Sequence, residues 1–159
     1  MSSSDSFAQV WDSLYLCTHV YNNVLVTMNV ILSIKPQFCK LIFDGVKRYE
    51  YRKRVFKRND IDKVYVYASS PICKVIGYFT VDGIINDTVS RVWDVTHEYG
   101  GIERGYYDSY FNGCDNGYAI KIDKVILFSV PIDPYIMLDN FHAPQNYMYV
   151  NIDLEKLSV

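Results

Sequence analysis

The stretch Ser33–Arg54, SIKPQFCKLIFDGVKRYEYRKR, decides the fold and holds most of the candidate chemistry. Pro36 suits the first turn of a helix, where a missing backbone N–H costs nothing. The apolar residues that follow recur at helical spacing: Phe38, Leu41 and Ile42. Gly45 suits the position after the last turn, where a left-handed residue closes a helix. The pattern therefore predicts a helix over 36–44 that ends just before a cation-rich strand.

In that predicted strand, charged residues alternate with tyrosines. Tyr49, Tyr51 and Val55 would lie on one face, and the charged residues on the other: Arg48, Glu50, Arg52 and Arg54. Glu50 and Arg52 would then be neighbours close enough to interact. Seven of the chain's sixteen Lys and Arg residues lie in 47–58 with Glu50 as the only acid, a net +6. Two interpretations stay open: a site for an anionic ligand, or a strand edge whose cations prevent aggregation.

Composition indicates one folded domain. The chain has 159 residues, is 50% hydrophobic and only 21% charged, which excludes disorder. Its net charge of −2 argues against a protein that coats DNA non-specifically. The fifteen tyrosines suit half-buried strands, stacking platforms and protein interfaces alike.

The remaining elements are short. Strand patterns are predicted over 29–34, 64–69, 75–85 and 117–128, and helical patterns over 88–99 and 102–111. The turn SSPICK favours a hairpin between the second and third of these strands. Few helices connect the strands, which does not favour βαβ units. We expect an α+β fold, a small mixed β-barrel with flanking helices.

The N-terminus and the cysteines exclude several classes. Residues 1–27 lack Lys and Arg, and the eleven-residue run VLVTMNVILSI is too short to span a bilayer. Helical spacing predicts an amphipathic helix over 6–17 in an N-terminal extension, followed by the core domain over 28–159. Four scattered cysteines and three histidines show no metal-ligand spacing. The expectation is a cytoplasmic protein with reduced thiols, no metal, no cofactor and no membrane segment.

The pattern GxKxxExR, present as Gly45, Lys47, Glu50 and Arg52, resembles the ASCH domain family. That family is a branch of the PUA-like superfamily, which also includes EVE and YTH domains. Further matching blocks follow the family's order: SIKP before the motif, then YASSP, VIGYFTV and the terminal HAPQNYMYV. The resemblance covers Asn29 to Val150. It implies a pseudo-barrel with a cleft between the first helix and the sheet.

The resemblance also implies a site. Relatives bind RNA or read a single modified base, and Lys47, Glu50 and Arg52 would face the cleft, with three candidate wall residues: Ser69, Ser70 and Gln145. Lysine offers a point charge for phosphate, and arginine a planar fork for phosphate or a stacked base. Glu50 would accept hydrogen bonds from a base or hold Arg52, or the two would form only a structural ion pair. The predicted stacking surfaces are Tyr49, Tyr51, Tyr65 and Tyr67. The predicted basic rim is Arg48, Lys53, Arg54, Lys57 and Arg58.

Three functions follow. The leading hypothesis is a binding module for RNA or a nucleotide-like ligand. The second is an amidohydrolase or nuclease acting on a modified nucleoside or RNA, with Lys47 and Glu50 as the catalytic candidates. Relatives that cleave acylated cytidine use a Lys, a Thr and a Glu, but Glu50 occupies the threonine position here, and no histidine lies near the motif. The third is a protein–protein inhibitor of phage or mobile-element origin, which a stoichiometric protein partner would support and co-purified nucleic acid would oppose.

Overall fold

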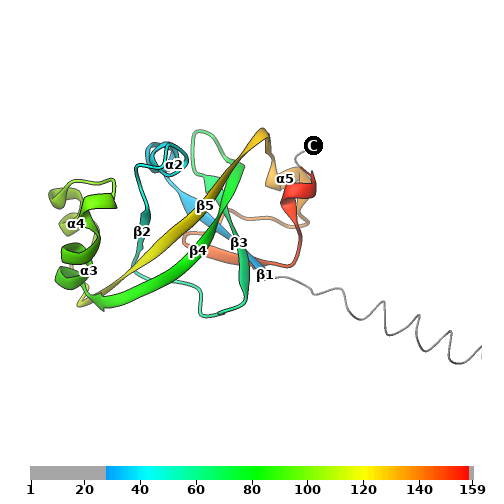
Figure 1. The fold of residues 1–159 in the computed structure, drawn as a ribbon. Helices are drawn as coiled ribbons and strands as arrows, with labels where there is room; N and C mark the ends of the chain where they lie inside the picture. The colour runs from blue at the N-terminus through cyan, green and yellow to red at the C-terminus, as the bar shows by residue number, and fades with distance from the viewer. Residues whose placement is uncertain (1–27, 158–159) are drawn as a thin grey trace, which may run out of the picture.

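A computed structural model describes residues 28–157, so the helix predicted over 6–17 lies outside the described residues (Figure 1). The elements in chain order are β1 (Met28–Ile34), α2 (Pro36–Phe43), β2 (Tyr49–Arg52), β3 (Ile61–Ala68), β4 (Lys74–Thr88), α3 (Val89–Thr96), the 3₁₀ helix η1 (His97–Tyr99), α4 (Arg104–Tyr110), β5 (Asn116–Ile132), α5 (Pro134–Met137), β6 (Tyr147–Val150) and the 3₁₀ helix η2 (Leu154–Leu157). None of these helices is long and apolar enough to cross a membrane within residues 28–157.

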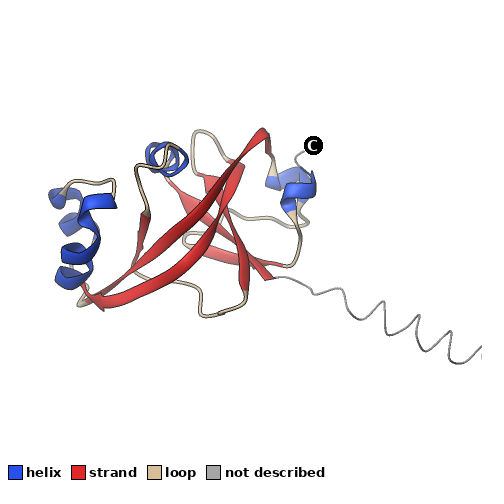
Figure 2. Cartoon of the chain, viewed as in Figure 1, coloured by secondary structure: helices blue, strands red, loops and turns tan. Residues whose placement is uncertain are grey.

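The strands form one six-stranded mixed sheet in the order β2-β5-β4-β3-β1-β6, which confirms the α+β class (Figure 2). β3 and β4 pair antiparallel, as the turn predicts. β1 and β3 pair in parallel, a pairing that the sequence pattern does not predict. The chain between them, through α2 and β2, is long enough to return and run in the same direction. Within the described strands, no ladder joins β2 to β6, so the hydrogen-bonded sheet is open.

Helix α2 follows the local pattern of its sequence. Pro36 occupies its first turn, and the side chains of Cys39 and Ile42 are buried against the sheet. Gly45 has a φ of +75°, a left-handed conformation that costs glycine little, and its N–H donates to the Ile42 carbonyl. The helix ends at Phe43, one residue earlier than predicted, and the turn delivers the chain into β2.

The strands β4 and β5 are longer than predicted. Beyond Phe79, where the pairing of β4 with β3 ends, they continue to pair with each other, and β2 pairs with the other side of β5. β4 has 15 residues and β5 has 17, and their register runs out to the pair Thr88–Asn116. The chain between them forms α3, η1 and α4, which lie together at one end of the molecule (Figure 1, left). Thr88 caps α3 by accepting from the Arg91 N–H.

This helical insertion packs on the sheet through its own apolar cluster. Tyr107 of α4, Phe111 directly after α4 and Val92 of α3 are buried against Tyr51 of β2. The rings of Tyr51 and Tyr107 meet edge to face at 4.9 Å. The insertion is therefore fixed beside β2, next to the cation-rich segment.

Candidate functional site

A cavity of about 800 Å³ opens between α2, β2, the turn after β3, α4 and the segment before β6. Its wall includes all six residues predicted to contact a ligand: Lys47, Glu50, Arg52, Ser69, Ser70 and Gln145. These six residues, which are spread from position 47 to position 145 in the sequence, thus line the same cavity. Their role in binding stays a prediction.

Lys47 lies at the inner end of the cavity. Its backbone N–H donates to the Leu41 carbonyl of α2 at 2.9 Å, so the turn after the helix fixes its position. Its side chain is only 2% exposed, and Nζ donates to the Gly100 carbonyl at 2.7 Å. A Cβ at Gly100 would lie 2.2 Å from the Tyr51 hydroxyl, so only glycine lets this carbonyl approach so closely. Burial lowers the pKa of Lys47, against the opposing attraction of Glu50.

Glu50 and Arg52 are adjacent on one face of β2, as strand alternation predicts. Arg52 Nη2 lies 3.1 Å from Glu50 Oε1 and donates to the Ser33 carbonyl at 2.6 Å. Arg52 Nη1 donates to Asn146 Oδ1 at 3.3 Å. The buried Arg52 Nε has no hydrogen-bond partner within residues 28–157, at a cost of about 1–3 kcal/mol.

The cavity wall is rich in aromatic rings. Six line it: Phe38, Tyr51, Tyr67, Tyr106, Tyr110 and Tyr135. The predicted stacking role of Tyr65 is wrong, because its side chain is fully buried and its hydroxyl donates to Asp153. Tyr49 does not line the cavity and packs with the α3–α4 cluster instead. The sequence does signal Tyr106 and Tyr110, which lie four residues apart on one helix face.

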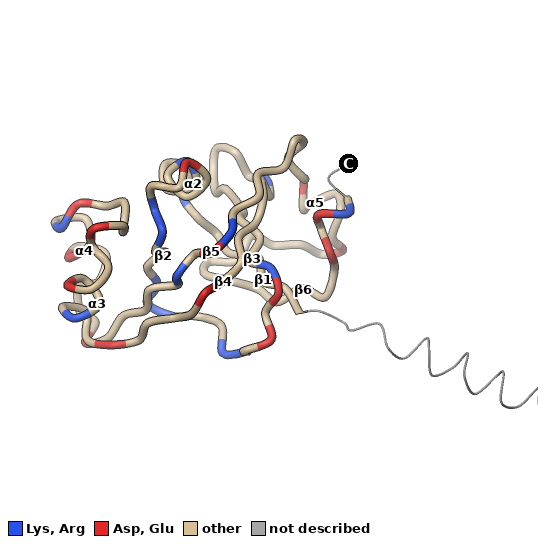
Figure 3. Tube along the Cα trace, viewed as in Figure 1, with Lys and Arg blue, Asp and Glu red and all other residues tan. Residues whose placement is uncertain are grey.

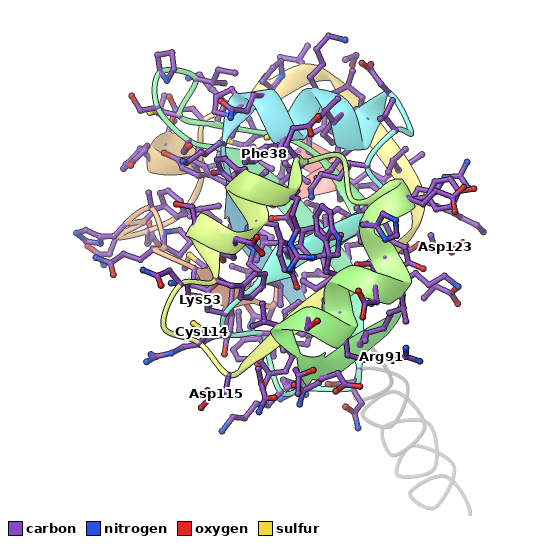
Figure 4. The ribbon with its side chains drawn as sticks, turned by 90° about the vertical axis from the view of Figure 1, so that its left-hand side faces the viewer. Phe38, Lys53, Arg91, Cys114, Asp115 and Asp123 are labelled. Atoms are coloured by element: carbon purple, nitrogen blue, oxygen red, sulfur yellow. The ribbon has the colours of Figure 1, made fainter. Side chains whose placement is uncertain are left out.

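The predicted basic rim is only partly at the cavity. Lys53 and Arg54 line it, together with Lys35, which no charge pattern in the sequence singles out. Figure 4 looks onto α3 and α4 and shows Phe38 and Lys53 on two sides of α4, with Arg91 on α3 away from both. The Lys53 Nζ lies 5.5 Å from the Tyr110 ring.

Three rim residues do not line the cavity. Arg48 lies over the Tyr99 ring at 4.6 Å, because it precedes β2 and its side chain turns outward. Arg58 is held by both oxygens of Asp60, two residues further along the chain. The third is Lys57. Figure 3 shows Lys and Arg positions gathered where the chain enters and leaves β2.

The charge of the cavity differs from that of the chain. Its lining contains five cations, Lys35, Lys47, Arg52, Lys53 and Arg54, against the single carboxylate Glu50, a net +4 on a chain of net −2. Within the described residues, no group of three His, Cys, Asp or Glu side chains is arranged to hold a metal. Neither His97 nor His142 lines the cavity. The cysteines of the described part, Cys39, Cys73 and Cys114, are free thiols.

The family model of the ASCH domain matches residues 32–126. The chain belongs to the ASCH domain family. This ASCH chain is 27% identical over 127 residues to the ASCH domain-containing ribonuclease of Zymomonas mobilis, covering 76% of this chain and 82% of that protein. It is 25% identical over 107 residues to the large ribosomal subunit protein uL22 of Ureaplasma parvum, covering 67% of this chain. The match covers 34% of uL22, so the chain spans about a third of the length of that relative.

Solved structures agree on the fold of this ASCH chain. A crystal structure of ASCH from Zymomonas mobilis superposes with a TM-score of 0.74 at 23% identity, covering 82% of this chain and 92% of that chain. A mutant of that protein superposes with a TM-score of 0.72 at 24% identity, covering 77% and 87%. At this identity the structural similarity shows that the two proteins share a fold. The chemistry of the cavity depends on the residues that line it in this chain.

Proposed function

We propose that this ASCH domain binds a nucleotide unit of RNA in the cavity between α2, α4 and the sheet. The observation that carries the proposal is the cavity lining, which combines a net charge of +4 with six aromatic rings. Phosphates are attracted by concentrated cations, and bases stack on aromatic faces. A nucleotide presents both groups on one small molecule.

The buried residues have distinct roles in this proposal. Lys47 and Arg52 attract phosphate or hydrogen-bond a base edge, while Glu50 holds both cations in place. Ser69, Ser70 and Gln145 offer neutral polar contacts that orient a base. The choice of RNA rests on the Zymomonas mobilis relative, which is named a ribonuclease.

A purely structural ion cluster is the competing interpretation. Buried ion pairs contribute little to stability once desolvation is counted, and a well-packed apolar group often does as well. Here the Lys47–Glu50–Arg52 cluster also includes a buried donor without a partner in the described part of the chain, Arg52 Nε. The cluster borders an 800 Å³ cavity instead of a packed core, which favours a ligand-binding role.

The test measures the affinity of a fluorescent single-stranded RNA octamer by anisotropy. Arg52→Lys keeps the charge but loses the planar fork, and the expected result is a roughly tenfold loss of affinity. The matched control is Arg91→Lys on α3, an exposed arginine that does not line the cavity. Equal affinity of the wild type and Arg52→Lys, with both proteins folded, would refute the proposal.

RNA cleavage is a second candidate function. Two observations favour it: the ribonuclease relative, and a cavity lysine whose pKa burial lowers, beside a carboxylate. Cleavage without a metal needs a base to take the 2′-hydroxyl proton as the 2′-oxygen attacks phosphorus, and an acid to protonate the leaving 5′-oxygen. Lys47 and Glu50 are the candidates for these proton transfers.

The cleavage test incubates an RNA with the protein in EDTA and looks for a product ending in 2′,3′-cyclic phosphate. Lys47→Met should remove this product while the protein stays folded, and a substrate with a 2′-deoxy sugar at the cut should stay intact. Intact RNA with the wild-type protein would leave binding as the function of the cavity.

A further inference from the structure

The cations of the described surface fall into two groups. Most of those outside the cavity are neutralised by carboxylates, in the pairs Lys40–Asp44, Arg58–Asp60, Lys63–Asp153, Lys74–Asp133, Arg104–Asp108 and Lys121–Asp82. Four cations in and around the cavity form no ion pair with any carboxylate in residues 28–157: Lys35, Lys53, Arg54 and Lys57. Four further cations of residues 28–157 form no ion pair and lie outside the cavity: Arg48, Arg91, Lys124 and Lys156. Half of the unpaired cations in this part of the chain thus lie in or beside the cavity.

Two of these cations continue from the cavity toward the edge strand β6. Arg54 lines the cavity, and its carbonyl accepts from Asn146 Nδ2 at 2.9 Å. Three residues later, the Lys57 backbone N–H donates to the Tyr149 hydroxyl at 3.0 Å. Tyr149 lies on β6 and is 37% exposed, with its ring 5.6 Å from that of Tyr147. The segment that carries Arg54 and Lys57 therefore runs from the cavity wall to the exposed ring of Tyr149.

We propose that a single RNA strand leaves the cavity across Arg54 and Lys57 and reaches Tyr149, so that the ligand is an oligonucleotide and not a free mononucleotide. This inference rests on the proposed function of the cavity. Arg54 and Lys57 would each contact a phosphate, and Tyr149 would stack on a base. We call these three residues the exit track.

Protection of a sheet edge is the other role that exposed cations beside β6 would serve. That role requires no nucleic acid and predicts no dependence of affinity on ligand length. An exit track predicts that affinity rises with the number of nucleotides. It also predicts a salt dependence that grows with each phosphate contact, because bound counterions are released.

The experiment measures the affinity of uridine monophosphate and of uridine oligomers of two, four and eight nucleotides at several salt concentrations. The affinity of the wild type is expected to rise at least roughly tenfold from the monophosphate to the octamer. Lys57→Gln and Arg54→Gln should each reduce this gain, and each should lower the octamer's salt slope by about 0.7. Tyr149→Leu should reduce the gain without changing the salt slope. The matched controls are Lys124→Gln and Arg91→Gln, exposed cations outside the cavity and the exit track.

The possible outcomes separate the two proposals. An octamer that binds no more tightly than the monophosphate overturns the exit track and leaves the proposed function standing. The exit track is also overturned if Lys57→Gln and Lys124→Gln have equal effects on the octamer. Absence of binding for every uridine ligand overturns both proposals.

Discussion

Lys47 and Glu50 face each other in a corner of the cavity that is almost closed to water: Nζ lies 3.5 Å from Oε2, and the two side chains are 2% and 7% exposed. The other oxygen of Glu50 lies 3.1 Å from Arg52 Nη2. One carboxylate therefore compensates two buried cations. Because Glu50 serves both cations, substitution of Glu50 and substitution of a single cation should change the free energy of unfolding by different amounts.

Glu50→Gln should destabilise the protein by about 3 kcal/mol, because it leaves two buried cations without a carboxylate. Lys47→Met should cost less, since Glu50 keeps Arg52 as its partner and methionine fills much of the same space. Urea unfolding of both variants measures the difference. A larger loss in Lys47→Met would show that Glu50 is not the common partner.

Stability should depend on pH through Lys47. Burial holds the pKa of Lys47 below its ordinary 10.5 in the folded state. Between that lowered pKa and 10.5 the unfolded chain binds more protons than the folded one, so this group's contribution to stability rises with pH in that window. Below this window Lys47 is charged in both the folded and the unfolded chain, so the cost of burying its charge lowers the free energy of unfolding in full. The free energy of unfolding of the wild type minus that of Lys47→Met should therefore increase as pH rises toward 10.5, and a flat difference would contradict the prediction.

Asn146 should position Arg52. Its Oδ1 accepts from Arg52 Nη1 at 3.3 Å, while its Nδ2 donates to the Arg54 carbonyl at 2.9 Å. Asn146→Ala should weaken RNA binding about fivefold with no change in the charge of the cavity. Gln145→Ala, at the neighbouring lining residue, is the comparison. If Gln145→Ala weakens RNA binding more than Asn146→Ala does, Gln145 and not Asn146 makes the more important contribution to binding.

Tyr106 should provide a stacking surface. Its ring meets Phe38 edge to face at 5.3 Å, and its hydroxyl accepts from Lys35 Nζ at 3.2 Å. Tyr106→Ala should lower the affinity for RNA roughly tenfold, whereas Tyr106→Phe should stay within about twofold, because it keeps the ring. Similar losses in both variants would assign the effect to the hydroxyl.

Local features of the fold are predictable from the sequence. Helix α2 and the left-handed Gly45 in the turn after it follow from the spacing of residues within a single short segment of chain. The parallel pairing of β1 with β3 does not, because it joins segments separated by α2 and β2 and is decided by packing. The strand predicted over 75–85 stops three residues short of the end of β4, because Asn86, Asp87 and Thr88 are exposed polar residues that give no apolar alternation.

The charged centre of the site is likewise local, since Lys47, Glu50 and Arg52 lie within six residues. Its supporting groups are not. The Gly100 carbonyl gives no periodic signal, and Asn146 is linked to the motif only through the family block HAPQNYMYV, which does not assign it a role. Counting charges also overstates the basic rim, because it ignores local carboxylates such as the one that neutralises Arg58.

The insertion of α3, η1 and α4 between β4 and β5 makes one wall of the cavity a separate segment of the chain. The scaffold supplies the buried charges through α2 and β2, whereas the insertion supplies Tyr106 and Tyr110 and is joined to the sheet at only two points of the chain. Exchange of this one segment would change a wall of the cavity, provided that the new segment keeps the carbonyl that binds Lys47 and the apolar side chains that cover Tyr51. Evolution and protein engineering therefore have a single replaceable cassette through which an ASCH domain can acquire a different ligand.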